Sequence, residues 1–364
     1  MKIDMYRMRK MTTLSLLAAI ALAGTEAMGQ NSNWLSTAPD LLWDNAANWS
    51  TPSKPGANNL AFIGLASGTV QLSTNETVEA FRTANGRDVN HTAGTLTVAG
   101  NGNQDSFLGE FNNVNWDGTD SIYTMSGSAI YNQTDGKLFI LARGGDGQLL
   151  MSDNAQMTSN GEIWFGMDND FIGVISDNAA VSAVTIQMTR FASDDSILTL
   201  QDNASLSTSG FFVMSDHPTL SGDSTLKLEG SGLTINFGGL FAREGATLDF
   251  LADAGGISTI NLDGPSDLFD NNSGLDPQLV VDLTSFAGLG EITLIDKTGL
   301  DTVSGQFRGL AEGAVVAGTN GRTISYVGGD GNDVVLSAVP EPGSMVLLAL
   351  GGLLVARRRR GSDN

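Results

Sequence analysis

Two pairs of aspartates are the residues of this sequence whose types and spacing best suit an acid–base catalytic site. Asp168 and Asp170 are separated by one residue, and Asp194 and Asp195 are adjacent. Two carboxyl groups in different environments can act as the proton donor and the base of glycosidic bond cleavage. The two pairs are therefore the candidates for a polysaccharide-cleaving site.

The residues that should accompany such pairs are absent. The chain has two histidines, His91 and His217, and no cysteine, which disfavours histidine-rich metal sites and excludes thiol catalysis and disulfides. The Gly-His-Gly and Arg-x-Lys segments that accompany paired aspartates in polygalacturonases are missing, and neither His217 nor Arg190 has a partner motif nearby. We therefore predict that the protein is not an enzyme.

A glycine-rich segment near the C-terminus, GGDGNDVV, contains Asp330 and Asp333. It matches one unit of the Gly-Gly-x-Gly-x-Asp calcium repeat, in which carbonyl and carboxylate oxygens hold Ca²⁺ between successive units. A single unit supplies half of such a site, so the segment is predicted to be the turn of a hairpin that joins residues 323–327 to residues 334–336. Calcium at Asp330 and Asp333 remains an alternative, and no other cofactor is predicted.

Three tryptophans, Trp34, Trp43 and Trp49, make the N-terminal part of the chain rich in aromatic residues. Large aromatic rings can cover the apolar end of a stack of strands. Alternatively, exposed rings could stack on sugars. The stretch WDNAANWSTPSKPGANNLAFIG resembles the opening of secreted β-helix proteins of the autotransporter-associated repeat type, which implies a cap on a β-helix.

A weak repeat fills the middle of the chain. The stretches GQLLMSDNAQMTSNGEIWFG, FIGVISDNAAVSAVTIQMTR and SILTLQDNASLSTSGFFVMS each place alternating apolar runs around Asp-Asn-Ala, and Asp153, Asp177 and Asp202 are 24 and 25 residues apart. Short strands repeated at this period, with no helical periodicity, predict the coils of a β-solenoid. The repeated aspartates could form a ladder of cation ligands, but Asp and Asn are also turn residues, and we favour turns.

The C-terminal segment VPEPGSMVLLALGGLLVARRRRGSDN differs from everything before it. After Pro340, Glu341 and Pro342, residues 343–356 carry no charge; as a helix this stretch would span about 21 Å, less than the roughly 30 Å hydrocarbon layer. The basic cluster that follows would stay on the cytoplasmic side and act as a membrane stop. It consists of Arg357, Arg358, Arg359 and Arg360.

This order of triplet, short apolar run and arginines resembles the PEP-CTERM sorting signal. The resemblance implies that an exosortase-type enzyme recognises Pro340, Glu341 and Pro342 and removes the tail, after the precursor has been held transiently in the inner membrane. An ordinary membrane anchor is the alternative. The N-terminus fits export, because basic residues precede an apolar stretch and a small-residue cleavage site, which predicts a signal peptide over residues 1–29.

The net charge of −21 argues against nucleic acid as a partner. The predicted fold is all-β: a right-handed parallel β-helix (β-solenoid) with an N-terminal cap, a C-terminal β hairpin and a short C-terminal transmembrane helix over residues 343–356. We expect an exported structural or adhesive protein of the cell surface or extracellular matrix, with extracellular polysaccharide as a candidate partner. A carbohydrate-binding or polysaccharide-degrading β-helix is the alternative. The predicted segments are 1–29 (signal peptide), 30–92 (aromatic cap and first strands), 93–300 (repeats), 301–338 (closing hairpin) and 339–364 (sorting signal).

Overall fold

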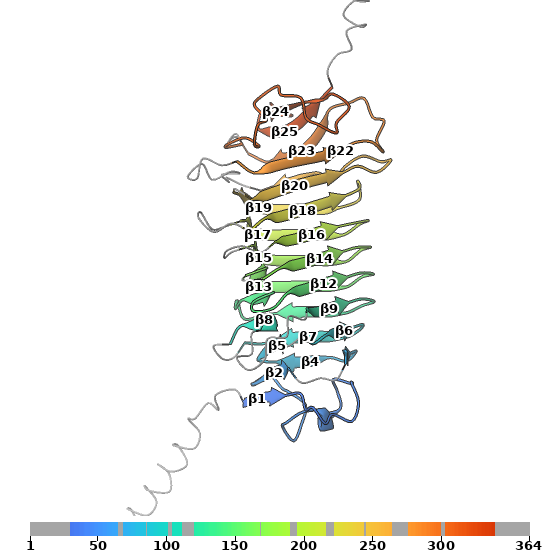
Figure 1. Ribbon diagram of the computed structural model, residues 1–364, viewed down its shortest axis with the longest axis vertical. Helices are drawn as coiled ribbons and strands as arrows, with labels where there is room; N and C mark the ends of the chain where they lie inside the picture. Colours follow the sequence, from blue (N-terminus) through green and yellow to red (C-terminus); the bar gives the residue numbers. More distant parts are fainter. Residues whose placement is uncertain are drawn as a thin grey trace, which may run out of the picture.

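The fold is known from a computed structural model. It describes residues 30–64, 68–84, 86–100, 104–110, 120–167, 169–189, 195–215, 222–243, 245–263, 276–299 and 303–338. Within these ranges nearly all regular structure is β-strand, arranged in an elongated stack (Figure 1), and the one helix is a 3₁₀ turn, η1 (Ala46–Asn48). The prediction of an all-β chain with parallel strands is confirmed. The predicted signal peptide and the sorting signal from residue 339 onward lie outside the described residues.

One sheet has nine strands, and every neighbouring pair in it is parallel. Its strands follow one another in chain order, but each is separated from the next by strands of the other sheet. In that order they are β3 (Val70–Leu72), β6 (Val89–His91), β9 (Ser121–Met125), β12 (Gly147–Met151), β14 (Phe171–Ile175), β16 (Ser196–Leu200), β18 (Ser224–Glu229), β20 (Ala246–Leu251) and β22 (Gln278–Asp282).

The other sheet has sixteen strands and is parallel except at its C-terminal end. Its main path runs through β1 (Gln30–Asn33), β2 (Asn59–Ile63), β5 (Ala80–Ala84), β8 (Ser106–Glu110), β11 (Phe139–Leu141), β13 (Gln156–Phe165), β15 (Ala180–Met188), β17 (Ser205–Met214), β19 (Thr234–Ala242), β21 (Ile260–Leu262), β23 (Ile292–Lys297), β25 (Asp333–Ser337) and β24 (Thr323–Gly328). Beside this path lie β4 (Glu76–Val78), β7 (Thr95–Val98) and β10 (Ile130–Gln133).

The sequence period corresponds to the pairing register. Gly147 on β12 is paired with Phe171 on β14, which is paired with Ser196 on β16, so consecutive layers are offset by one repeat. Here a layer means one strand of the nine-stranded sheet together with the strands of the other sheet that follow it before the next layer begins. Because the offset equals the repeat, equivalent side chains of successive layers lie side by side.

The core lies between the two sheets. Strands β14 and β16 both have alternating buried and more exposed residues, as expected for strands with one face in the core. Phe165 on β13 stacks on Phe171 on β14 with ring centroids 4.8 Å apart, which joins the two sheets. Leu198 and Leu200 are fully buried in the same continuous cluster.

The C-terminal end of the stack is closed by an antiparallel hairpin. Strands β24 and β25 pair from Thr323 opposite Ser337 to Gly328 opposite Asp333, as the sequence predicted for this segment. The Arg322 side chain donates to the backbone carbonyls of Gly288 and Gly290, which ties the start of the hairpin to the preceding loop. Among the described residues, no helix is both long enough and apolar enough to span a bilayer.

Candidate functional site

The three N-terminal tryptophans are buried. Trp34, Trp43 and Trp49 are 1%, 0% and 3% exposed, and Trp49 contacts each of the other two edge-on with centroids 5.0 Å apart. The Trp49 indole N–H donates to the Trp43 carbonyl at 2.9 Å, and Trp43 also lies 5.9 Å from Phe81 on β5. No ring face is open to a sugar, so the structure does not support the glycan contact that was considered for these residues.

The side chain of Asp40 organises this aromatic segment. Its two carboxylate oxygens accept hydrogen bonds from Asn48 at 2.6 Å and Asn45 at 2.7 Å, and the Leu42 backbone N–H donates to it at 3.0 Å. The hydrogen bond from Asn48, followed by those from Leu42 and Asn45, lowers the pKa of Asp40 below its ordinary value. Sequence reasoning missed Asp40, although an aspartate a few residues before two asparagines is a recognisable turn signal.

The repeated Asp-Asn pairs are turn residues. Asp153, Asp177 and Asp202 all have left-handed backbones, with φ of 58°, 55° and 59°. One carboxylate oxygen of Asp177 accepts from the Asp153 backbone N–H at 3.1 Å, and Asp202 accepts in the same way from Asp177 at 3.3 Å. In the preceding layer Gly127 occupies the equivalent position, with φ of 61°, and donates to Asp153 at 2.8 Å. The turn interpretation is therefore confirmed.

A second row of aspartates precedes the strands of the nine-stranded sheet. Asp146 accepts from the Asp170 backbone N–H at 3.3 Å, Asp170 from Asp195 at 2.8 Å, and Asp195 from Asp223 at 3.2 Å. Burial, and then the charges of Asp170 and Asp120, raise the pKa of Asp146. Asp170 and Asp195 thus belong to successive layers of one structural ladder. Their sequence partners Asp168 and Asp194, together with Arg190 and His217, lie outside the described residues.

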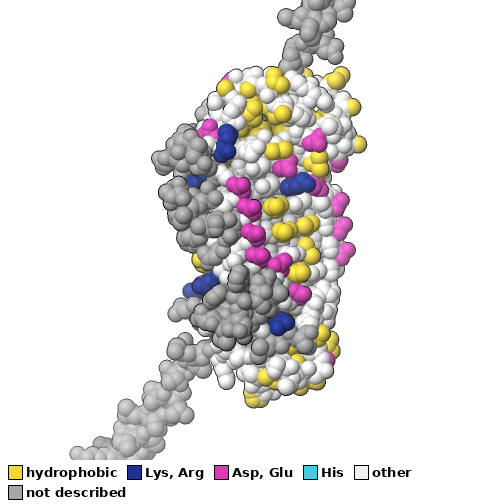
Figure 2. All heavy atoms as spheres, viewed as in Figure 1, with side chains coloured by type: hydrophobic (Ala, Val, Ile, Leu, Met, Phe, Trp, Pro, Cys, Tyr) yellow, Lys and Arg dark blue, Asp and Glu magenta, His cyan; other side chains and the backbone are white. Residues whose placement is uncertain are grey.

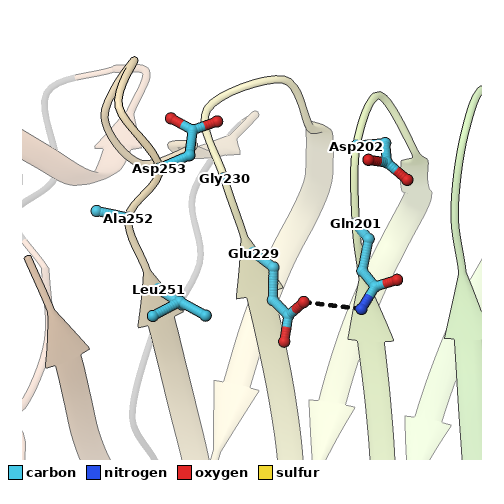
Figure 3. A pocket seen from close by; sticks show the side chains of 7 residues that line it. All are labelled: Gln201, Asp202, Glu229, Gly230, Leu251, Ala252 and Asp253. Carbon is cyan, nitrogen blue, oxygen red and sulfur yellow. Dashed lines mark hydrogen bonds between the residues drawn. The ribbon is translucent and has the colours of Figure 1, made fainter. Parts of the chain in front are cut away.

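A shallow hollow of about 270 Å³ lies where the turns of three layers meet (Figure 3). Its polar groups already have partners: Glu229 accepts from the Gln201 amide at 2.7 Å and pairs with Lys227 at 2.6 Å. The Asp253 carboxylate accepts from Ser231 and from the backbone N–H of Gly255. We find no free acid and base facing each other in this hollow. Its lining residues are Gln201, Asp202, Glu229, Gly230, Leu251, Ala252 and Asp253.

The candidate calcium segment forms the turn of the C-terminal hairpin. Gly331 N–H donates to the Gly328 carbonyl at 2.7 Å, and the carboxylate of Asp333 accepts from the Lys297 backbone N–H at 2.9 Å. Burial is the main cause of the raised pKa of Asp333, followed in the same direction by the charges of Asp296 and Asp330. Asp333 therefore fastens the hairpin to β23, whereas Asp330 is exposed. Within the described ranges no group of three or more His, Cys, Asp or Glu residues could hold a metal ion.

His91 is buried in the core beside Tyr123. Its Nδ1 lies 3.0 Å from the Tyr123 hydroxyl, and its Nε2 lies 3.1 Å from the Gly94 carbonyl. Burial lowers the pKa of His91 to about 4, against hydrogen bonds to Gly94 and Ala93 that act to raise it. The imidazole is therefore neutral at pH 7 and acts as a packed, hydrogen-bonded core residue.

Comparison with known proteins identifies the C-terminus. The PEP-CTERM protein-sorting motif matches residues 338–360, which include Pro340, Glu341, Pro342 and the four arginines 357–360. No curated protein and no solved structure matched the chain. The motif implies export to the cell surface through a membrane-anchored precursor, and sorting by an exosortase. The chain therefore carries a PEP-CTERM sorting motif at its C-terminus.

Proposed function

We propose that this is an exported, non-enzymatic protein with a structural or adhesive role at the cell surface or in the extracellular matrix. The observation that carries the proposal is the PEP-CTERM motif at residues 338–360. We further propose that the ectodomain is a right-handed β-solenoid, since the chain alternates between two parallel sheets and each turn adds one layer.

The construction of the stack supports a structural role. Without cysteines, stability comes from a core that continues through successive layers, in which Leu200, Leu206 and Phe212 are fully buried. The strand edges at both ends are occupied. At the N-terminal end of the nine-stranded sheet the Trp43 N–H donates to the carbonyl of Gln71 on β3. At the other end the N–H of Leu283, which directly follows β22, donates to the Gly318 carbonyl. Covered edges favour a stack that does not add further chains end to end.

The acidic side chains support a non-enzymatic role. The candidate carboxylates among the described residues, Asp170 and Asp195, accept hydrogen bonds from backbone N–H groups of the next layer. Hydrogen bonds that join successive layers in this way support a structural role for these two carboxylates. Glycoside cleavage needs two carboxyl groups on either side of the scissile bond.

The test uses the protein recovered from the outside of the cell. We expect cells that lack it to attach to surfaces less well or to retain less matrix, and expect the purified protein to release no reducing sugar from matrix polysaccharide. Reducing-sugar release that disappears on heat denaturation would contradict the non-enzymatic proposal. Unchanged attachment and matrix content in cells lacking the protein would contradict the structural role.

Carbohydrate binding is a second candidate because of one exposed aromatic pair. Phe211 on β17 is 41% exposed, and its ring centroid lies 4.7 Å from that of Phe241 on β19. Aromatic faces on a sheet surface can stack on sugar rings. A glycan array tests this with Phe211→Ser against Val184→Ser, a change at a similarly exposed apolar residue on β15. Loss of a glycan signal in the first variant alone would support the candidate, and absence of any signal would exclude it.

A further inference from the structure

The outer face of the nine-stranded sheet carries an apolar stripe, formed by Leu150, Ile172, Val174 and Ile197. These residues are contiguous, because Leu150 is paired with Val174 and Ile172 is paired with Ile197. Ile172 and Ile197 are 46% and 40% exposed. Large aliphatic side chains at adjacent outward positions are unusual on a solvated sheet face, where polar residues normally alternate with the core residues.

Carboxylates border the apolar stripe at both strand ends. Figure 2 shows acidic side chains on either side of an apolar patch on this face. One row of aspartates directly precedes strands β12, β14 and β16 in the chain, and the other row follows the same strands. About seven residues of extended chain separate Asp170 from Asp177, which corresponds to roughly 23 Å. The first row is Asp146, Asp170 and Asp195, and the second row is Asp153, Asp177 and Asp202.

In the part of the chain that the structure describes, no ion pair joins a basic side chain to either row of aspartates. The outward basic residue nearest the apolar stripe on this sheet is Lys227 on β18, which is already paired with Glu229 at 2.6 Å. Each aspartate of the rows uses one carboxylate oxygen for a backbone N–H, as in Asp170 and Asp177. The side chains Asp153, Asp170, Asp177, Asp195 and Asp202 are exposed, so their negative charge faces solvent.

We propose that this face binds an amphipathic basic α-helix of another protein, lying along the stack axis. The apolar side of the helix would cover the apolar stripe, and lysines or arginines on its two borders would meet the two rows of aspartates. The Cα cylinder of a helix is about 5 Å wide. Basic side chains that reach about 6 Å on each side, with hydrogen bonds of about 3 Å to the carboxylates, extend this to about 23 Å, which matches the distance between the rows. One basic residue per 5.4 Å turn approximates one aspartate per strand spacing of about 4.8 Å.

Charge complementarity selects this partner over others. Two aspartate rows would repel a nucleic acid, an anionic polysaccharide or the same face of a second copy. The apolar stripe has no aromatic ring, so it lacks the flat surface on which neutral sugars stack. The inference does not depend on the structural role proposed above, because its test measures binding by the folded ectodomain alone.

The test uses a labelled synthetic helix as the probe. The peptide, of about 14 residues, has leucines along one side and lysines along both borders. Its binding to the protein recovered from the outside of the cell is followed by fluorescence anisotropy. We expect saturable binding that weakens as salt is raised, and much weaker binding of a peptide with the same composition in scrambled order.

Two sets of variants separate the effect of the second aspartate row from that of the general negative charge. The first combines Asp153→Asn, Asp177→Asn and Asp202→Asn, because asparagine tolerates the left-handed backbone and keeps a hydrogen-bond acceptor. Its control removes three exposed charges elsewhere. We expect the first set to weaken binding about tenfold and the control to change it less than about twofold. The control set is Asp263→Asn, Glu291→Gln and Asp296→Asn.

A change in the apolar stripe completes the test. Ile172→Ser with Ile197→Ser leaves every charge in place, and we expect it to weaken binding at least as much as the triple asparagine variant. The proposal is overturned if the amphipathic peptide does not bind, if the scrambled peptide binds equally well, or if the control set weakens binding as much as the first set. Unfolding midpoints within experimental error of the wild type would show that each variant is folded.

Discussion

The left-handed turn at Asp177 separates two contributions to the stability of the stack. Its φ of 55° is unfavourable for a residue with a β-carbon, by about 1–2 kcal/mol, unless a short polar side chain bonds locally. Its carboxylate also accepts from the Asp153 N–H at 3.1 Å, an exposed hydrogen bond worth about 0.5–1 kcal/mol. Asp177→Ala removes the hydrogen bond and leaves the backbone strain, so we expect it to lower the free energy of unfolding by about 2 kcal/mol.

Two further substitutions at the same position isolate each contribution. Asp177→Asn keeps both the acceptor and the tolerance of a left-handed backbone, so we expect a change below about 0.5 kcal/mol. Asp177→Gly accepts the backbone but loses the hydrogen bond, and we expect a loss of about 1 kcal/mol. Urea unfolding of the three purified variants, with unchanged slopes, gives these differences directly. Equal stability of the alanine and asparagine variants would refute the reasoning for this turn.

Three further predictions concern the core and the C-terminal hairpin. Burial lowers the pKa of His91 to about 4 from an ordinary 6.5, so the unfolded chain binds the proton first as the pH falls. The free energy of unfolding should therefore decrease by about 3 kcal/mol between pH 6.5 and pH 4 because of this residue. Wild type and His91→Gln should therefore differ in the pH dependence of urea unfolding over this window, and parallel curves would contradict the assignment. Leu200→Asp places a charge in the core and should cost several kcal/mol, whereas Asn203→Ser in an exposed turn should cost about 1 kcal/mol or less; equal shifts in the unfolding midpoint would mean that the layers are wrongly assigned. Tyr326→Phe removes a buried hydroxyl that donates to Leu310 and accepts from Phe307, so thermal unfolding should show a loss of about 1–3 kcal/mol, and an unchanged midpoint would argue against this network.

The repeat could be predicted because each layer uses the same turn. Asp153, Asp177 and Asp202 recur at nearly constant spacing, since a left-handed turn residue must occupy the same place in every layer. Strand alternation then identified inward residues such as Leu200. The class and the parallel pairing follow from these two local signals, which do not depend on distant parts of the chain.

The second aspartate row was not predicted, for a physical reason. Asp170 and Asp195 are 25 residues apart, but Asp195 and Asp223 are 28 apart, because the connections before these strands differ in length. A ladder that tolerates insertions has no fixed period in the sequence. The aromatic cap was predicted, but the contacts that bury Trp43 and Trp49 were not, since they involve the Asp40 network and Phe81, which lies much later in the chain.

The apolar stripe could not be predicted either, because it depends on pairing between neighbouring strands. Ile172 and Ile197 each occupy one outward position in a strand, where a single apolar residue is ordinary. They form a continuous surface only because the register places them side by side. The sorting motif is the opposite case: its triplet, apolar run and arginines are contiguous, so the sequence alone was sufficient to identify it.

Processing of the C-terminal tail is the central claim, and mass spectrometry of the C-terminal peptide tests it most directly. Protein recovered from the outside of wild-type cells should lack the apolar run and the four arginines that follow Pro342. Glu341→Ala leaves that run and the arginines intact, so insertion should be unchanged while the full-length protein accumulates in the membrane fraction. A C-terminal peptide that extends to Asn364 on extracellular wild-type protein would contradict the account.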